Sequence, residues 1–182
     1  TAVSACWKLG IPAPDCAPVV SFEGGGADET LGNTIDNSVN TDTPGINKMI
    51  LIPITPSADL TVESISVMVD TTSVTARFAA VVYSHSSITL GPSVLQAVSA
   101  QTVGAVDDTL VTCAFITPPN LQRGVQYWIG IISDFTGAYR KSNDTGTAGV
   151  LVSQPYDNGP PDTFLLPLPK AEIIGDILDT QS

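Results

Sequence analysis

The chain has 182 residues, of which 43% are hydrophobic and 14% are charged, and its formal net charge is −11. This length suits one sizeable domain, and the apolar fraction is enough for a core, so we do not expect the whole chain to be disordered. So negative a surface repels phosphate backbones and anionic lipids, and no Lys/Arg cluster offers a local exception. Neither nucleic acid nor a membrane is therefore expected as a partner.

The first part of the chain, residues 1–48, differs from the rest because Gly, Asn, Asp and Pro are frequent and periodicity is weak. Its one β-patterned run lies within 17–22. We expect an extended N-terminal arm with one strand and a long polar loop, which is either functional or a floppy terminus. Cys6 and Cys16 lie ten apart, which leaves a disulfide between them open.

From Met49 onward, short runs rich in β-branched and aromatic residues alternate with turns that carry Pro, Gly, Asp or Ser. This spacing is typical of antiparallel sandwiches, and it predicts about eight or nine strands. The predicted strands lie within 49–54, 60–69, 77–83, 93–98, 110–115, 125–132, 149–153 and 163–168.

Three local features refine this prediction. Pro53 cannot donate to a sheet ladder, so it indicates an edge strand or a strand end. The apolar phase slips at Glu63-Ser64, which indicates a β-bulge. Cys113 shares one side of its run with Val111 and Phe115, so we expect a buried free thiol that packs as a small hydrophobe.

The last part of the chain is apolar for a terminus, and its one helical pattern covers 170–179. Ile173, Ile174, Ile177 and Leu178 form a stripe at helical spacing, which predicts a short helix or tail. We expect these four side chains to pack on the sandwich or on a partner, because exposed apolar surface is costly. The expected organisation is an arm over 1–48, a β-sandwich over 49–169 and a tail over 170–182.

Candidate catalytic groups are sparse. His85 is the only histidine and lies between serines, but no GxSxG elbow is present, so we expect an ordinary turn residue. Aspartates such as Asp134 and Asp157 fall in predicted loops, where solvated turn residues are the main interpretation and a calcium site or a carboxylate pair are alternatives. Cysteine spacing does not suit zinc, and we expect no metal and no cofactor.

Aromatic residues give the main candidates for ligand contact. Tyr127 and Trp128 are strand neighbours and point to opposite faces, so one is expected in the core, and which one is buried decides whether the other is available. Tyr139, beside Arg140-Lys141, and Tyr156 are the better surface candidates. Their flat faces suit stacking on sugar rings, and the competing interpretation is a structural anchor at the base of a loop.

The middle of the chain carries a further pattern. Val82-Tyr83-Ser84-His85-Ser86-Ser87 leads to a Gly91-Pro92 turn, and the run Leu121 to Ile131 follows after 110–115. This arrangement, over Leu60 to Asp134, resembles a jelly-roll β-sandwich module of tailed-bacteriophage structural proteins and some secreted bacterial proteins. The resemblance implies an all-β, jelly-roll-like antiparallel β-sandwich associated with a virion. It implies no catalytic residues, and His85 departs from the acidic or polar residue common in such turns.

We therefore expect a non-enzymatic virion structural protein, most simply a capsid decoration (cement) protein that stabilises a shell through subunit-bridging contacts. Its partners would be the major capsid protein or another virion protein, and further copies of itself, with a trimer favoured. It would lie on the capsid surface or tail. The alternative is a carbohydrate- or receptor-binding module of a phage tail or a secreted protein, which would be extracellular and bind a glycan. A hydrolase that uses loop carboxylates is the third hypothesis.

Overall fold

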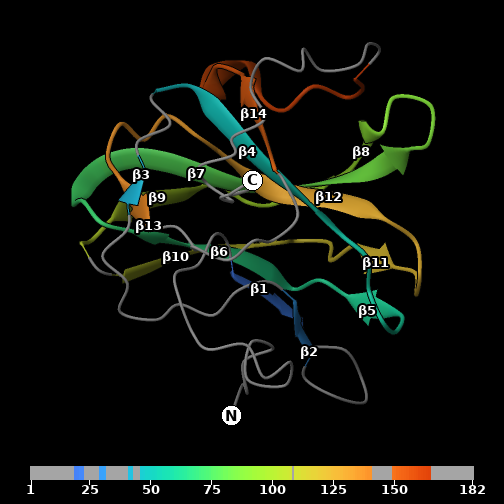
Figure 1. The fold of residues 1–182 in the computed structure, drawn as a ribbon. Helices are drawn as coiled ribbons and strands as arrows, with labels where there is room; N and C mark the ends of the chain where they lie inside the picture. Colours follow the sequence, from blue (N-terminus) through green and yellow to red (C-terminus); the bar gives the residue numbers. More distant parts are fainter. Residues whose placement is uncertain are drawn as a thin grey trace, which may run out of the picture.

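The computed structural model describes residues 19–22, 29–31, 41–42, 46–107, 109–140 and 149–164. Within these ranges the chain forms strands β1 to β14 and one 3-10 turn, η1. The strand pairs are antiparallel and build two curled six-stranded sheets that face each other (Figure 1). The predicted all-β class and the antiparallel β-sandwich are thus confirmed.

The first sheet is built around β6, which pairs with strands from three parts of the chain. Its order is β2, β1, β6, β13 and β3, and β10 also pairs with β6. The bounds are β1 Val19–Phe22, β2 Glu29–Leu31, β3 Thr41–Asp42, β6 Ser64–Val69, β10 Thr109–Ala114 and β13 Tyr139–Arg140.

The second sheet is built around β12, which lies between β4 and β7. Its order is β14, β4, β12, β7 and β8, and β9 pairs with the first half of the long strand β7. The bounds are β4 Lys48–Ile54, β7 Ser73–Ser86, β8 Gly91–Val98, β9 Thr102–Ala105, β12 Tyr127–Ser133 and β14 Val150–Ser153. A small separate pair joins β5 Leu60–Thr61 to β11 Asn120–Leu121, and η1 is Tyr156–Asn158.

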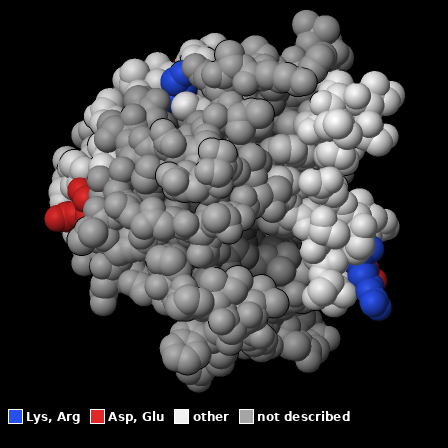
Figure 2. Space-filling view, in the orientation of Figure 1, with Lys and Arg blue, Asp and Glu red and all other residues white. Residues whose placement is uncertain are grey.

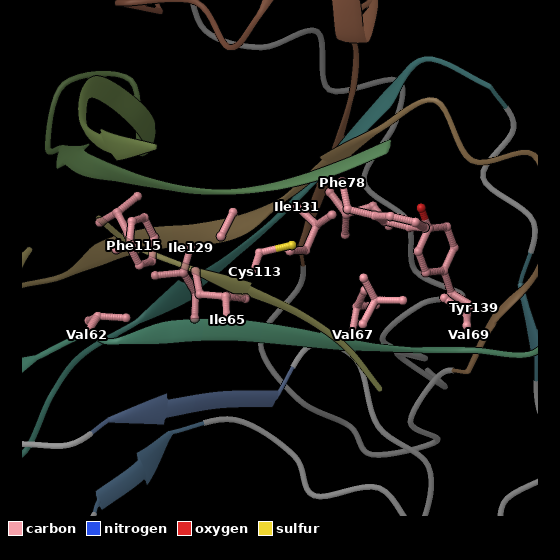
Figure 3. Close-up of a cluster of buried hydrophobic side chains, with 14 of the residues drawn as sticks. Val62, Ile65, Val67, Val69, Phe78, Cys113, Phe115, Ile129, Ile131 and Tyr139 are labelled. Carbon is pink, nitrogen blue, oxygen red and sulfur yellow. The ribbon is translucent and has the colours of Figure 1, made fainter. Parts of the chain in front are cut away.

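The main core lies between the two sheets (Figure 3). Alternate residues of β6 and β10 point inward and meet the inner face of β7 and β12, as the period of two in a strand requires. Cys113 is fully buried there, with Val111 and Phe115 on the same side, so the interpretation of Cys113 as a buried free thiol is confirmed. Burial raises the pKa of this thiol.

A second apolar cluster covers the outer face of the β4–β12–β7 sheet. Trp128 and Tyr83 lie in this cluster, and Tyr156 and Phe164 from the segment 149–164 pack against it. The Tyr83 hydroxyl donates to the Pro161 carbonyl at 2.9 Å, which ties the same segment down. The second sheet is therefore covered on both faces. The first sheet packs against its inner face, and the segment 149–164 packs against its outer face.

The structure tests two local predictions, the strand end at Pro53 and the bulge at 63–64. Pro53 lies near the end of β4, past the last β14 pairing at Leu51, so the strand-end interpretation is confirmed. The predicted bulge at 63–64 is wrong: the chain breaks into β5 and β6. Between them the Val62 N–H donates to Pro119, and the Glu63 carbonyl accepts from Phe115.

Strands β2, β3, β9, β11 and β13 were not predicted. Of the expected strand within 163–168, Thr163 forms an isolated bridge with Val94, and 165–168 lie outside the described residues. Cys6, Cys16 and the expected helix at 170–179 also lie outside them.

Candidate functional site

Trp128 is not available for ligand contact. Its side chain is 5% exposed and packs in the outer cluster, while Tyr127 is buried in the main core. The sequence predicts that one of the two neighbours lies in the core, and the structure buries both. The physical reason is that β12 is covered on both faces, so both directions of the pleat are interior.

His85 is a strand residue rather than a turn residue, since it lies in β7. The Trp128 indole N–H donates to His85 Nδ1 at 3.1 Å. Because an indole can only donate, this nitrogen of His85 carries no proton while the bond exists. The neighbouring Ser84 hydroxyl accepts from the Val94 backbone N–H at 3.1 Å, and Ser86 Oγ accepts from Thr89 N–H at 3.1 Å. The His–Ser cluster is thus engaged in local structure rather than arranged as a nucleophile and its base.

Tyr139, expected on the surface, is buried in the main core. Its hydroxyl is hydrogen-bonded to the buried Ser133, and its ring packs edge-on against Phe135 with centroids 5.1 Å apart. Burial raises the pKa of the Tyr139 phenol. The prediction was wrong because it relied on the polar and basic residues beside Tyr139 in the sequence. In the structure, β13 pairs with β6, and this pairing carries Tyr139 into the core.

Tyr156 is half-buried beside a polar cluster on the outer face of the second sheet. Arg77 of β7 lies over the Tyr156 ring, with the guanidinium carbon 4.7 Å from the centroid. The same guanidinium binds Asp134 through Nε at 2.7 Å and Asp157 through Nη1 at 2.6 Å. The backbone N–H of Arg77 also donates to Asp134 at 2.6 Å. Two aspartates that lie 23 positions apart in the sequence therefore meet at one cation.

This Arg77 cluster does not suit acid–base catalysis. Hydrogen bonding and attraction from Arg77 hold the pKa of Asp157 below its usual value, whereas a glycosidase acid needs a raised one. The guanidinium occupies the face of Tyr156 that lies toward it, and that face is then not open for a sugar ring. The cluster links η1 to β7 and to the residue that follows β12, so it fastens the outer segment to the sheet.

The described surface has a different kind of feature between β9 and β10. A groove of about 380 Å³ is lined by Val74, Thr102, Val103, Gly104, Ala105, Val106, Thr109, Leu110, Val111 and Thr112. None of these side chains is charged. Four of them are strongly exposed aliphatics: Val74 at 80%, Val106 at 60%, Val103 at 56% and Leu110 at 46%.

The groove forms because β9 and β10 are bonded at one end only. The Ala100 N–H donates to the Ala114 carbonyl at 3.2 Å, and Thr102 Oγ1 donates to the Thr112 carbonyl at 3.0 Å. Beyond these bonds β9 follows β7 into one sheet while β10 follows β6 into the other. The gap that opens between them is the groove, at the edge of the sandwich. Sequence analysis missed it because β9 was not predicted.

On the face shown in Figure 2, the charged side chains of the described residues lie toward its margins. Over the described ranges, no three His, Cys, Asp or Glu side chains are grouped so that they could hold a metal ion. In the same part of the chain, no helix has the length and apolarity to cross a membrane.

Fold and surface together define an antiparallel all-β sandwich with a closed polar cluster on one sheet and an open groove without charged side chains at its edge. Comparisons of the chain with protein-family models, with curated proteins and with solved structures find no match.

Proposed function

We propose that this chain is a non-enzymatic structural protein of a virion, most simply a capsid decoration protein, and that it acts by bridging subunits. The observation that carries the proposal is the uncharged groove at the sandwich edge, where four exposed aliphatic side chains share one hollow. Concentrated exposed apolar surface is typical of protein contact sites. The resemblance of residues 60–134 to phage structural modules supplies the virion setting.

The Arg77 cluster supports the non-enzymatic part of the proposal. Asp134 and Asp157 both bind Arg77, so neither is placed as a proton donor. The carbohydrate-binding alternative is weakened, because its candidate aromatic side chains are not open to a sugar ring: Trp128 and Tyr139 are buried, and Tyr156 stacks with Arg77. A glycan array with the intact protein separates this alternative, since a bridging protein is expected to show no saccharide preference.

The first test is the mass of the protein in solution. Light scattering over a concentration series is expected to give a trimer or another closed oligomer, which the proposal requires if copies bridge one another. A truncation should remove only 1–18, because β1 pairs with β6 and a longer deletion would break the first sheet. A protein that is monomeric at all concentrations, with or without 1–18, contradicts assembly through its own copies.

A further inference from the structure

His85 and Trp128 form a hydrogen bond that only a neutral imidazole can make. The Trp128 indole N–H donates to His85 Nδ1 at 3.1 Å. An indole cannot accept, and a protonated imidazole carries a proton on both nitrogens, so protonation of His85 leaves two donors facing each other. The two ring centroids lie 6.5 Å apart, beyond the ~6 Å within which a cation interacts with a ring face. A cation–π contact therefore does not replace the lost bond.

The two partners differ in burial. The Trp128 side chain is 5% exposed and packs in the outer apolar cluster, whereas His85 is half-buried, so solvent protons reach its ring. Among the residues that the structure describes, His85 is the acceptor of the indole N–H. A buried donor that loses its acceptor bears its full desolvation cost. Protonation of a half-buried side chain thus acts on a buried one.

The elements around the contact contain few other groups that can change charge. Besides His85, their charged or titratable residues are Lys48 in β4, Asp59 and Arg123 beside the start of β12, Arg77 and Tyr83 in β7, Tyr127 in β12, and Asp162 in the segment 159–164. Strands β8 and β14 and the turn 87–90 have none. Carboxyl groups ordinarily titrate near pH 4 and phenols near pH 10, whereas imidazoles titrate near pH 6.5. His85 is therefore the residue of this set that mild acid protonates.

The contact lies where the segment 159–164 is held on the second sheet. Trp128 pairs with Tyr83 across β12 and β7, and the Phe164 ring lies against Tyr83 with centroids 5.0 Å apart. The Leu95 N–H of β8 donates to this segment at 2.9 Å, and the Phe164 N–H donates back to β8 at 2.8 Å. A shift of the Trp128 ring therefore disturbs the apolar surface on which the segment packs.

We propose that the His85–Trp128 hydrogen bond is a pH-sensitive contact, which holds the segment 159–164 on the second sheet while His85 is neutral and releases it in mild acid. The stabilisation is complete above about pH 6.5, where an imidazole in the unfolded chain is neutral, and is lost as pH falls toward 5. The release is local, because the main core lies on the other face of the sheet. This contact is independent of the bridging function proposed above.

The test compares the full-length wild type with three variants. His85→Asn keeps an acceptor close to the position of Nδ1 but cannot gain a charge, and Trp128→Phe removes the donor. Asp162→Asn is the matched control, because it removes the neighbouring carboxylate and leaves the contact intact. Hydrogen exchange followed by mass spectrometry measures the peptides that contain Leu95 and Phe164 from pH 8 to pH 5. Each variant is compared with wild type at the same pH, since the intrinsic exchange rate itself depends on pH.

Between pH 7.5 and pH 5.5, exchange of both peptides in wild type should rise by roughly tenfold relative to His85→Asn, as the stranding of one buried donor implies. Asp162→Asn should show the same rise. Trp128→Phe has no N–H to strand, so its exchange relative to His85→Asn should not depend on pH. The fluorescence of Trp128, read alone in a Trp7→Phe background, should change over the same pH range.

Three results overturn the pH-sensitive contact. An equal rise in wild type and His85→Asn assigns the acid response to carboxyl groups. A rise that disappears in Asp162→Asn assigns it to Asp162. Constant exchange while the Trp128 fluorescence titrates means that His85 is protonated without releasing the segment. Circular dichroism checks that each variant folds, and His85→Gln, which also accepts, replaces His85→Asn if that variant does not. Since every comparison is made within one chain, failure of the bridging function leaves these outcomes unchanged.

Discussion

Strands β12 and β10 are similar in length but differ in what surrounds them. Every residue of β12 is buried, because β4 and β7 flank it and apolar side chains cover both of its faces. Along β10, buried residues alternate with exposed ones, and its free edge opens on the groove. A change in β12 should therefore act on folding, whereas a change at the outward side chains of β10 should act on association.

The largest effect is expected at Gly130 of β12. A Cβ atom built there would lie 1.7 Å from the Ile50 carbonyl oxygen, so β4 and β12 would have to separate. Gly130→Ala should cost more than about 4 kcal/mol or prevent folding, as large steric conflicts in a core do. Urea unfolding followed by circular dichroism measures this.

Gly124→Ala is the matched control for that change. Gly124 has a φ of +72°, and nothing lies within 4 Å of an added Cβ. Only backbone strain opposes the alanine, so its cost should be about 1–2 kcal/mol. Equal losses at Gly124 and Gly130 would mean that close strand approach does not matter at β12.

The sequence predicted the strand type of both regions for different reasons. Alternation in 110–115 correctly placed Val111, Cys113 and Phe115 on one buried side. The continuous apolar run 125–132 predicted a strand but not that both of its faces are covered. That cover comes from 149–164, and a contact between distant segments leaves no local pattern at Trp128.

The sites were harder to predict for the same reason. Strand β9 contains Gly104, with a φ of +91°, and only four residues, so its β pattern is weak and the groove beside it could not be foreseen. Asp134 and Asp157 were recognised as candidates, but nothing local indicates that Arg77 binds both. Residue type marked Asp134 and Asp157 as polar groups of interest, but their partner is set by tertiary contacts that the local sequence does not encode.

The second-largest effect is expected for Trp128, which lies under the outer segment. Trp128→Ala should destabilise the protein by about 3–5 kcal/mol, because it leaves a cavity in a covered face. Trp128→Phe keeps most of the apolar volume and loses the bond to His85, so its cost should be nearer 1–2 kcal/mol. Denaturant unfolding of both variants measures the difference. A neutral Trp128→Ala would show that the outer cluster adds nothing to stability.

A smaller effect concerns alkaline pH and Tyr139. Burial raises the pKa of this phenol in the folded state above its value of about 10 in the unfolded chain. Its contribution to stability is complete below about pH 10 and is lost as pH rises toward the folded-state value. Tyr139→Phe should therefore show a smaller loss of stability between about pH 8 and pH 11 than wild type. Part of the loss should remain, because burial also raises the pKa of Tyr83.

The smallest effect is expected at the Arg77 cluster, because Asp157 is exposed. Arg77 lowers the pKa of Asp157, so the stabilisation is present above the unfolded-state pKa of about 3.9 and is lost as pH falls through the lower folded-state value. Asp157→Asn should lower the unfolding midpoint slightly at neutral pH and flatten its decline below about pH 4.

Asp107→Asn removes the same charge next to the groove, away from Arg77. If the fastening role of the cluster is right, only Asp157→Asn flattens the acid decline. An identical acid profile for both variants would reduce the Arg77 cluster to surface charge and leave the apolar contacts of Tyr156 and Phe164 to hold the outer segment.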